Sequence, residues 1–414
     1  MKIAHNHRYY MYMLLALLVG STSACKKKSV GDEGLLESPA TGTRGELTLD
    51  SIFLYAKHTY LWNEELPSYT GFNPRKYVTG SGELVDFKTA LFGISRYALN
   101  PATRFPYEQS SLPGTAKYAY LESGAGSSGT IAALPTQAQA AASSNRISFL
   151  ISGEKGYLKL TEFSHPTVLN PPLDNAFQRF ADARVTELVI DLRGNSGGYV
   201  ETATYLANLI ASPTLNGQVM FSQHFNTQMQ QAKAGILKNQ VYLDENSRPV
   251  YTKGRLATYA DVDFSVAGNT FRYEKKGTLT TVKSLNFLVN GGTASASELL
   301  INSLKPYFEL KLLGSKTYGK PVGAFGIKID RYMLYVPNFL IKNARGESDY
   351  FGGMPVDFPL SDAQIGTAPL DILENVALAV KGSSAQSSER PASATEIPKL
   401  SQAFMVQHEL RLLP

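Results

Sequence analysis

Ser295 stands where a serine could act as a nucleophile. It follows a strand-like run, residues 285–290, and precedes residues 296–307, whose apolar side chains recur with helical spacing. At the N-terminus of a helix, exposed N–H groups and the positive end of the helix dipole can stabilise an oxyanion that forms beside Ser295 Oγ. Ser295 and Glu298 also match a helix capping box, so the same residues have a purely structural interpretation.

Ser196 is a second candidate nucleophile, because residues 194–198 match the pattern G-x-S-x-G after the strand-like run 187–191. A hydrolase that used a serine, an aspartate and a histidine would need the histidine later in the chain, and only His224 and His408 follow. In the alternative interpretation, Ser196 is an ordinary turn residue, and the glycines let the backbone come close to a ligand.

A serine hydroxyl becomes a good nucleophile only when a base takes its proton. No histidine lies near Ser295 in the sequence, but a lysine can serve if burial lowers its pKa from about 10.4 towards 7. Lys320 is the candidate base, because it follows the strand-like run 308–313 and lies between Gly319 and Pro321. In the alternative interpretation, this lysine is a solvated charge in a loop.

Two nucleotide-binding patterns match only in part. Residues 124–129 satisfy G-x-G-x-x-G, but Pro135 interrupts the helix that must follow. Residues 314–320 fit most of G-x-x-x-x-G-K-[ST], but Pro321 replaces the hydroxyl that binds Mg²⁺. Cys25 is the only cysteine, which excludes a disulfide framework and a cysteine-rich metal site. We therefore expect no cofactor and no metal ion.

The composition is that of a globular protein with two to three domains. Of 414 residues, 43% are apolar and 18% are charged, with a net charge of +5. Residues 1–28 hold five basic residues and no acidic one, so the remaining chain is neutral. A neutral folded part gives no electrostatic reason to expect a nucleic-acid partner.

The N-terminus has the pattern of an export signal. Basic residues precede the apolar run 11–20, which is too short to span a bilayer. Small residues, Thr22-Ser23-Ala24, then lead to Cys25, and this junction resembles a bacterial lipobox. We expect residues 1–24 to be a signal peptide and Cys25 to carry a lipid that anchors the exported protein, facing the periplasm or the cell surface. The alternative is a plain signal peptide with an incidental cysteine.

The rest of the chain divides by composition into five parts. Strand-like runs alternate with helical stretches in the largest part, which predicts an α/β core. The predicted parts are a flexible tether (25–46), a helical N-terminal subdomain (47–121), a low-complexity linker (122–146), the α/β core (147–380) with an insertion or cap at 217–284, and a linker and tail (381–414).

Three motifs together resemble the S41 family, the tail-specific or C-terminal processing proteases. They are Asp191 to Gly198, Thr293 to Glu298 and Thr317 to Lys320, in the family's order. The interval of 25 residues from position 295 to position 320 is also the family's serine-to-lysine spacing. Leu61-Trp62-Asn63-Glu64 is similar to the N-terminal region of Bacteroidetes-type lipoproteins of this family.

The resemblance implies a fold and a set of roles. The fold would be a ClpP/crotonase-like α/β core with a small helical N-terminal subdomain. Ser295 resembles the family's nucleophile and Lys320 its general base. The backbone N–H of Ala296, together with one from the Gly197-Gly198 turn, resembles its oxyanion hole.

This sequence departs from the family pattern at two places. Ala324 stands where many members have a glutamine that orients the lysine, so the lysine must be oriented by other groups. Residues 108–148 are too few and too polar for the PDZ domain that the family usually carries, so we expect no intact PDZ domain. The leading hypothesis is a serine endopeptidase that cleaves exported proteins or peptides through an acyl-enzyme. The alternative is a catalytically silent peptide-binding lipoprotein.

Overall fold

The computed structural model describes residues 38–123, 146–244, 248–382, 405–406 and 410–413. The predicted signal peptide, Cys25 and the G-x-G-x-x-G match at 124–129 lie outside the described residues. Within the described part of the chain, we find no helix with the length and apolar character needed to cross a membrane.

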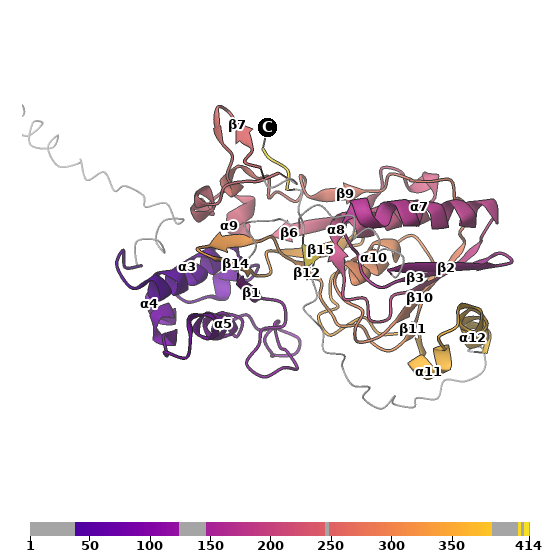
Figure 1. Ribbon diagram of the computed structural model, residues 1–414, viewed down its shortest axis with the longest axis horizontal. Helices are drawn as coiled ribbons and strands as arrows, with labels where there is room; N and C mark the ends of the chain where they lie inside the picture. Colours follow the sequence, from indigo (N-terminus) through magenta and orange to yellow (C-terminus); the bar gives the residue numbers. More distant parts are fainter. Residues whose placement is uncertain (1–37, 124–145, 245–247, 383–404, 407–409, 414) are drawn as a thin grey trace, which may run out of the picture.

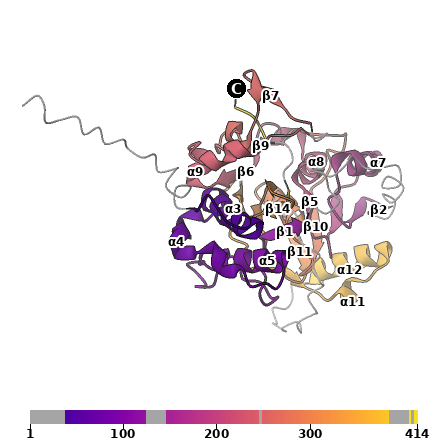
Figure 2. The same cartoon turned by 60° about the vertical axis from the view of Figure 1, so that its left-hand side comes forward.

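The N-terminal part is helical only as far as Ile94. Its first helix begins at Arg44, inside the predicted tether, because Thr43 Oγ1 accepts the N–H of Glu46 and the Glu46 carboxylate accepts the N–H of Thr43. Irregular chain and one strand, β1 (Tyr120–Ser123), follow the helices. The helices, which gather on one side of the molecule (Figure 2), are α3 (Arg44–Thr59), α4 (Tyr69–Phe72) and α5 (Glu83–Ile94), with 3₁₀ turns at Asn63–Glu65 and Pro74–Tyr77.

A six-stranded sheet forms the centre of the α/β core. Its order is β16-β11-β10-β4-β3-β2, and every pair is parallel except β2 with β3. The middle strands are buried on both faces, as is usual for a parallel sheet between helices. The strands are β2 (Ile147–Ser152), β3 (Lys155–Leu160), β4 (Glu187–Asp191), β10 (Ser284–Val289), β11 (Leu310–Gly314) and β16 (Phe358–Pro359).

Helices cover the two faces of this sheet (Figure 1). On one face lie α7 (Pro166–Asp182), α8 (Val200–Ile210) and α10 (Ala296–Leu304), of which α10 is buried along its whole length. On the other face, α11 (Asp362–Ile365) and α12 (Pro369–Gly382) pack on a separate apolar cluster. This arrangement confirms the predicted α/β class, although α12 extends into the segment predicted as a linker.

The segment predicted as an insertion is built into a second sheet rather than lying on the core as a cap. Its strands β6 and β9 join β15 and β12 in the order β12-β15-β6-β9. These strands are β6 (Val219–Phe225), β9 (Thr270–Arg272), β12 (Val322–Gly323) and β15 (Phe339–Asn343). Between β6 and β9 lie α9 (Thr227–Gln230), β7 (Tyr251–Thr252), β8 (Arg255–Leu256) and 3₁₀ turns at Gly235–Asn239 and Tyr259–Asp261, and a further 3₁₀ turn at Pro213–Leu215 precedes β6.

Strand β1 is the only strand among the described residues between the N-terminal helices and the core. It pairs with β14 (Tyr332–Tyr335), which also pairs with β13 (Ile327–Ile329). The described residues thus contain no PDZ domain at this position. Two short strands, β5 (Gly198–Tyr199) and β17 (Met405–Val406), pair with each other.

Candidate active site

Three loops meet at one edge of the six-stranded sheet, and they contain the three sequence motifs. Strands β4, β10 and β11 are adjacent and parallel, so their carboxyl ends lie at the same edge. The loops that leave them are residues 192–197, 290–295 and 315–321. The carboxyl edge of a parallel sheet is where α/β proteins commonly bind ligands.

Hydrogen bonds fix the first loop to the second. Thr293 Oγ1 donates to the carbonyl of Leu192 (2.8 Å), and the N–H of Ala294 donates to the carbonyl of Asn195 (3.0 Å). Ser297 Oγ donates to the same Asn195 carbonyl at 3.0 Å. The glycine-rich turn after β4 therefore lies against the segment that carries Ser295.

Ser295 is the residue immediately before α10, and its backbone is strained. Its φ and ψ angles are 63° and −115°, which are rare for a residue with a side chain. The residue is fully buried, and its Oγ is a buried polar atom with no hydrogen-bond partner. A buried hydroxyl without a partner is unfavourable for folding, and such features concentrate at functional sites.

The Glu298 carboxylate joins the second loop to the third. Its Oε2 accepts the N–H of Ser295 (3.0 Å) and the N–H of Lys320 (2.8 Å). Its Oε1 accepts the N–H of Gly319 (2.7 Å) and the hydroxyl of Thr317 (2.5 Å). The backbone nitrogens of Ser295 and Lys320 thus bind one oxygen and lie within about 6 Å of each other.

The Lys320 side chain is buried, with 4% of its surface exposed. Burial lowers the pKa of Lys320 to about 8, although the negative charges of Glu108 and Glu298 act in the opposite direction. A substantial fraction of this amine is therefore neutral near physiological pH. Only the neutral amine can accept a proton.

Glu108 is a fully buried carboxylate near Lys320 that the sequence analysis did not identify. It accepts the hydroxyl of Tyr60 (2.7 Å) and the N–H groups of Tyr118 (3.0 Å) and Ala119 (2.7 Å). Burial raises the pKa of Glu108, and these hydrogen bonds oppose that rise. No sequence motif marks Glu108, because its partners are remote tyrosine and backbone groups.

Two neighbouring residues attach the N-terminal part of the chain to the Lys320 loop. Tyr118 Oη donates to the carbonyl of Gly319 at 2.6 Å. Lys117 Nζ donates to the carbonyls of Tyr318 (3.1 Å) and Phe351 (2.7 Å). Burial lowers the pKa of Lys117 to about 8. These contacts position the loop that carries the candidate base.

The predicted oxyanion donors differ in their hydrogen bonding. Gly197 donates its N–H to Asn195 Oδ1 at 3.0 Å, so of the two glycines expected to supply one donor, Gly198 is the one whose N–H this bond does not engage. Gly198 has a φ of 139°, and a Cβ atom there would lie 2.1 Å from the carbonyl oxygen of Phe163. Only glycine fits at position 198, and Gly198 and Ala296 remain as candidate donors.

The alternative nucleophile, Ser196, lies half-buried in the same turn. Of its two candidate bases, His224 lies on β6, where its Nε2 is 2.9 Å from Ser222 Oγ. His408 lies outside the described residues. Within the described ranges, no group of three or more His, Cys, Asp or Glu residues is arranged to hold a metal ion.

Comparisons with known proteins place the core in a protease family. Residues 154–357 match the model of peptidase family S41. A chloroplastic carboxyl-terminal-processing peptidase of Arabidopsis thaliana is 27% identical over 208 residues, which cover 48% of this chain and 34% of that protein. A carboxy-terminal-processing protease of Bartonella bacilliformis is 23% identical over 203 residues, which cover 46% of this chain and 37% of that protein.

The chain therefore spans little more than a third of the length of these curated relatives. Among solved structures, the photosystem II D1 C-terminal processing protease aligns with 80% of this chain and 97% of its own. The TM-score of that alignment is 0.47, and the sequence identity is 14%.

Proposed function

Because residues 154–357 belong to peptidase family S41, we propose that this chain is a serine endopeptidase with Ser295 as nucleophile and Lys320 as general base. The observation that carries the proposal is the shared carboxylate of Glu298. It binds the backbone of both residues, so it holds a buried hydroxyl and a buried amine of lowered pKa in one rigid unit.

Each residue has a defined part in the proposed reaction. The neutral Lys320 amine takes the proton of Ser295 Oγ while the oxygen attacks the substrate carbonyl carbon. The N–H groups of Ala296 and Gly198 bind the oxyanion of the tetrahedral intermediate. Lys320 then gives its proton to the leaving amine, which produces an acyl-enzyme ester. A water molecule, deprotonated by the same amine, hydrolyses the ester and restores both residues.

The proposed substrates are exported proteins or peptides, and the proposed location is the outer face of a bacterial membrane. The export signal and the lipobox-like junction before Cys25 support this location. A single acyl chain binds membranes only weakly, so stable anchoring at Cys25 implies more than one chain.

The proposal is tested by cleavage of casein and of a fluorogenic peptide library by the purified chain in detergent. We expect Ser295→Ala to abolish cleavage, because loss of a nucleophile lowers the rate by about 10⁶ in a well-characterised serine protease. Ser303→Ala is the matched control, since Ser303 is also buried on α10 and its Oγ also has no partner. Ser196→Ala should leave measurable activity.

Two results would contradict the proposal. If Ser295→Ala kept full activity and Ser196→Ala had none, the nucleophile would be Ser196 in the first loop. A wild-type chain that binds unfolded peptides but cleaves none of them between pH 6 and 9 would favour the catalytically silent peptide-binding lipoprotein.

A further inference from the structure

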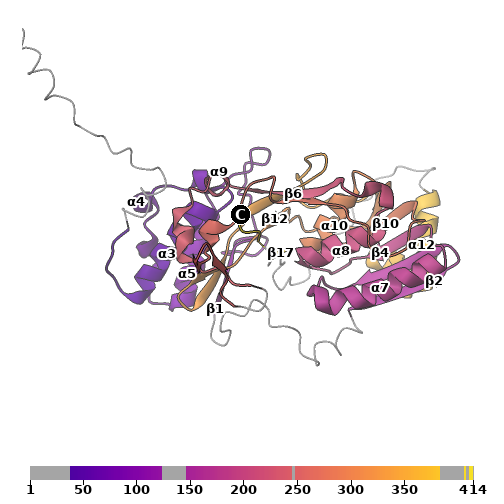
Figure 3. The same ribbon diagram turned by 90° about the horizontal axis from the view of Figure 1, so that it is seen from above.

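The C-terminal strand of the chain lies against the candidate oxyanion turn. Strand β17 pairs in parallel with β5, with Met405 opposite Gly198 and Val406 opposite Tyr199. It also lies alongside β12, which begins two residues after Lys320 (Figure 3). Strand β17 thus lies between β5, which follows the glycine-rich turn, and β12, which follows the candidate base.

The backbone N–H of Gly198 on β5 points toward this tail strand. The carbonyl of Gly197 accepts the N–H of Phe163 (2.9 Å), and the N–H of Tyr199 donates to the carbonyl of Phe163 (2.8 Å). Successive residues of a strand direct their N–H and carbonyl groups to opposite edges. The N–H of Gly198, a proposed oxyanion donor, therefore points to the edge where β17 lies.

The last described residues attach the tail to the chain on both sides of the β7-β8 hairpin. Tyr242 Oη donates to the carbonyl of Leu410 at 2.6 Å. Further on, the N–H of Asp263 donates to the carbonyl of Arg411, and the N–H of Leu413 donates to the carbonyl of Asp261, both at 2.8 Å. These two bonds bracket an antiparallel bridge and hold the end of the chain in one register.

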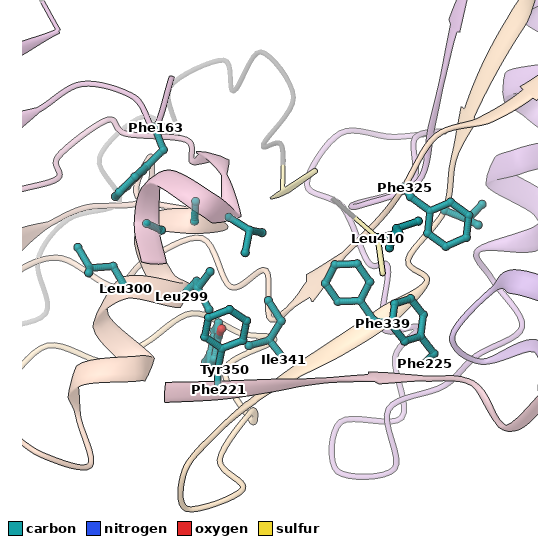
Figure 4. Packing of buried hydrophobic residues seen from close by; sticks show 14 of the residues in the cluster. Phe163, Phe221, Phe225, Leu299, Leu300, Phe325, Phe339, Ile341, Tyr350 and Leu410 are labelled. Atoms are coloured by element: carbon teal, nitrogen blue, oxygen red, sulfur yellow. The ribbon is translucent and has the colours of Figure 1, made fainter. Parts of the chain in front are cut away.

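Leu410 also fills an apolar site. It is 5% exposed and belongs to the large buried cluster, where it lies beside Phe225, Phe325 and Phe339 (Figure 4). Backbone pairing along one edge, together with a pocket for one apolar side chain, is how many domains bind an extended peptide strand.

We propose that the C-terminal segment is a resident competitive ligand that occupies the substrate position beside β5. Met405 and Val406 occupy the place of a substrate strand beside Gly198, and Leu410 to Leu413 hold them there. The proposal rests on the proposed function, because that function makes the edge of β5 the substrate site. A substrate must displace the tail before its carbonyl can reach Ser295 and the Gly198 N–H. Substrates would then be extended peptides that pair with β5 in the parallel orientation that β17 has.

The first experiment measures binding without catalysis. A chain truncated after Phe404 and carrying Ser295→Ala is titrated with a fluorescein-labelled peptide of the sequence from residue 403 to 414. We expect saturable binding by fluorescence anisotropy, with at least tenfold weaker binding to the Ser295→Ala chain that keeps its tail. Equal affinity of the two chains, or no binding to the truncated one, would overturn the proposal.

The second experiment keeps the anchor and breaks only the strand pairing in the full chain. Gly198 directs both its N–H and its carbonyl to β17, where Met405 is its partner. In a parallel ladder of this kind, the carbonyl of Gly198 accepts the N–H of the residue after that partner, which is Val406. Val406→Pro removes this donor, whereas Met405→Pro removes an N–H that faces the other way and is the matched control. We expect Val406→Pro, but not Met405→Pro, to lower KM for an unfolded peptide at least threefold.

The outcomes separate this inference from the proposed function. If the truncated Ser295→Ala chain binds the tail peptide while the truncated chain that keeps Ser295 cleaves nothing, the resident ligand is supported and the protease is overturned. A chain that cleaves peptides with the same KM in wild type, Val406→Pro and the truncated form would leave the protease intact and overturn the resident ligand. Thermal melts of all variants show whether each is folded. A truncated chain that fails to fold leaves the Val406→Pro and Met405→Pro pair as the deciding test.

Discussion

Replacing Glu298 by glutamine should slow catalysis and move its pH dependence to lower pH. Three of the four groups that donate to this carboxylate are backbone N–H groups, which cannot accept a hydrogen bond. The ionised form is the one that satisfies them all. Glu298→Gln keeps the shape of the side chain but replaces one acceptor oxygen with an NH₂ donor.

The hydrogen bonds set the size of the effect. The least unfavourable orientation keeps the amide oxygen on Ser295 and Lys320 and turns the NH₂ group to Thr317, whose hydroxyl can accept. The N–H of Gly319 then has no acceptor, which costs about 1–3 kcal/mol. If this whole cost is added to the activation free energy because Lys320 is no longer held in place, kcat/KM falls by up to about 150-fold.

The shift in pH dependence has a definite sign. The proposed mechanism requires neutral Lys320, so kcat/KM should rise with pH through the pKa of this residue, which burial lowers to about 8. The negative charge of Glu298 raises the pKa of Lys320, so its removal favours the neutral amine. The acid limb of the profile should therefore move to lower pH in Glu298→Gln.

The assay is kcat/KM for a fluorogenic peptide between pH 6 and 10, with a thermal melt of each variant. Glu187→Gln is the control, because Glu187 begins β4 at the far edge of the sheet and accepts a bond from Asn286. An acid limb that stays in place or moves to higher pH would refute the electrostatic argument. Unchanged kcat/KM at every pH would refute the positioning role.

Three further substitutions test other parts of the site. Lys320→Arg should be as inactive as Lys320→Ala in a peptidase assay, since guanidinium stays protonated. The control is Lys275→Arg, which should be active, because Lys275 is a half-buried lysine whose pKa burial also lowers to about 8. Gly198→Ala should abolish activity and lower the melting temperature, because its Cβ would overlap the Phe163 carbonyl; normal activity would contradict the close contact. Cys25→Ser should move the protein from the membrane to the soluble fraction, and continued membrane association in high salt would contradict the lipid anchor.

Local patterns in the sequence predicted the secondary structure on both sides of Ser295. The strand-like run before Ser295 is β10, and the helical pattern after it is α10, because both follow from side-chain periodicity within a few residues. Sequence also suggested a capping box there. Only the Glu298 half is formed, because its carboxylate bonds the Ser295 N–H while Ser295 Oγ stays unpartnered.

Contacts between distant segments could not be predicted in this way. The segment at 217–284 looked like a polar cap, but its strand β6 pairs with β15, more than 100 residues later in the chain. Neither strand carries a signal for its partner, since strand periodicity specifies a face and not a neighbour. For the same reason the sequence did not predict β17, which pairs with β5 beside the candidate oxyanion turn.

The resemblance to family S41 led us to expect a glutamine at position 324 to orient Lys320, and Ala324 has no polar group for this purpose. Two buried carboxylates, Glu108 and Glu298, act on Lys320 electrostatically. Glu108 is fixed by three donors and raises the pKa of Lys320, as Glu298 does. Because Tyr118 binds both Glu108 and the Lys320 loop, we expect the N-terminal part of the chain to influence the protonation of Lys320, the candidate base. A change that loosens this part should therefore alter the pH profile of catalysis before it alters the binding of a peptide beside β5.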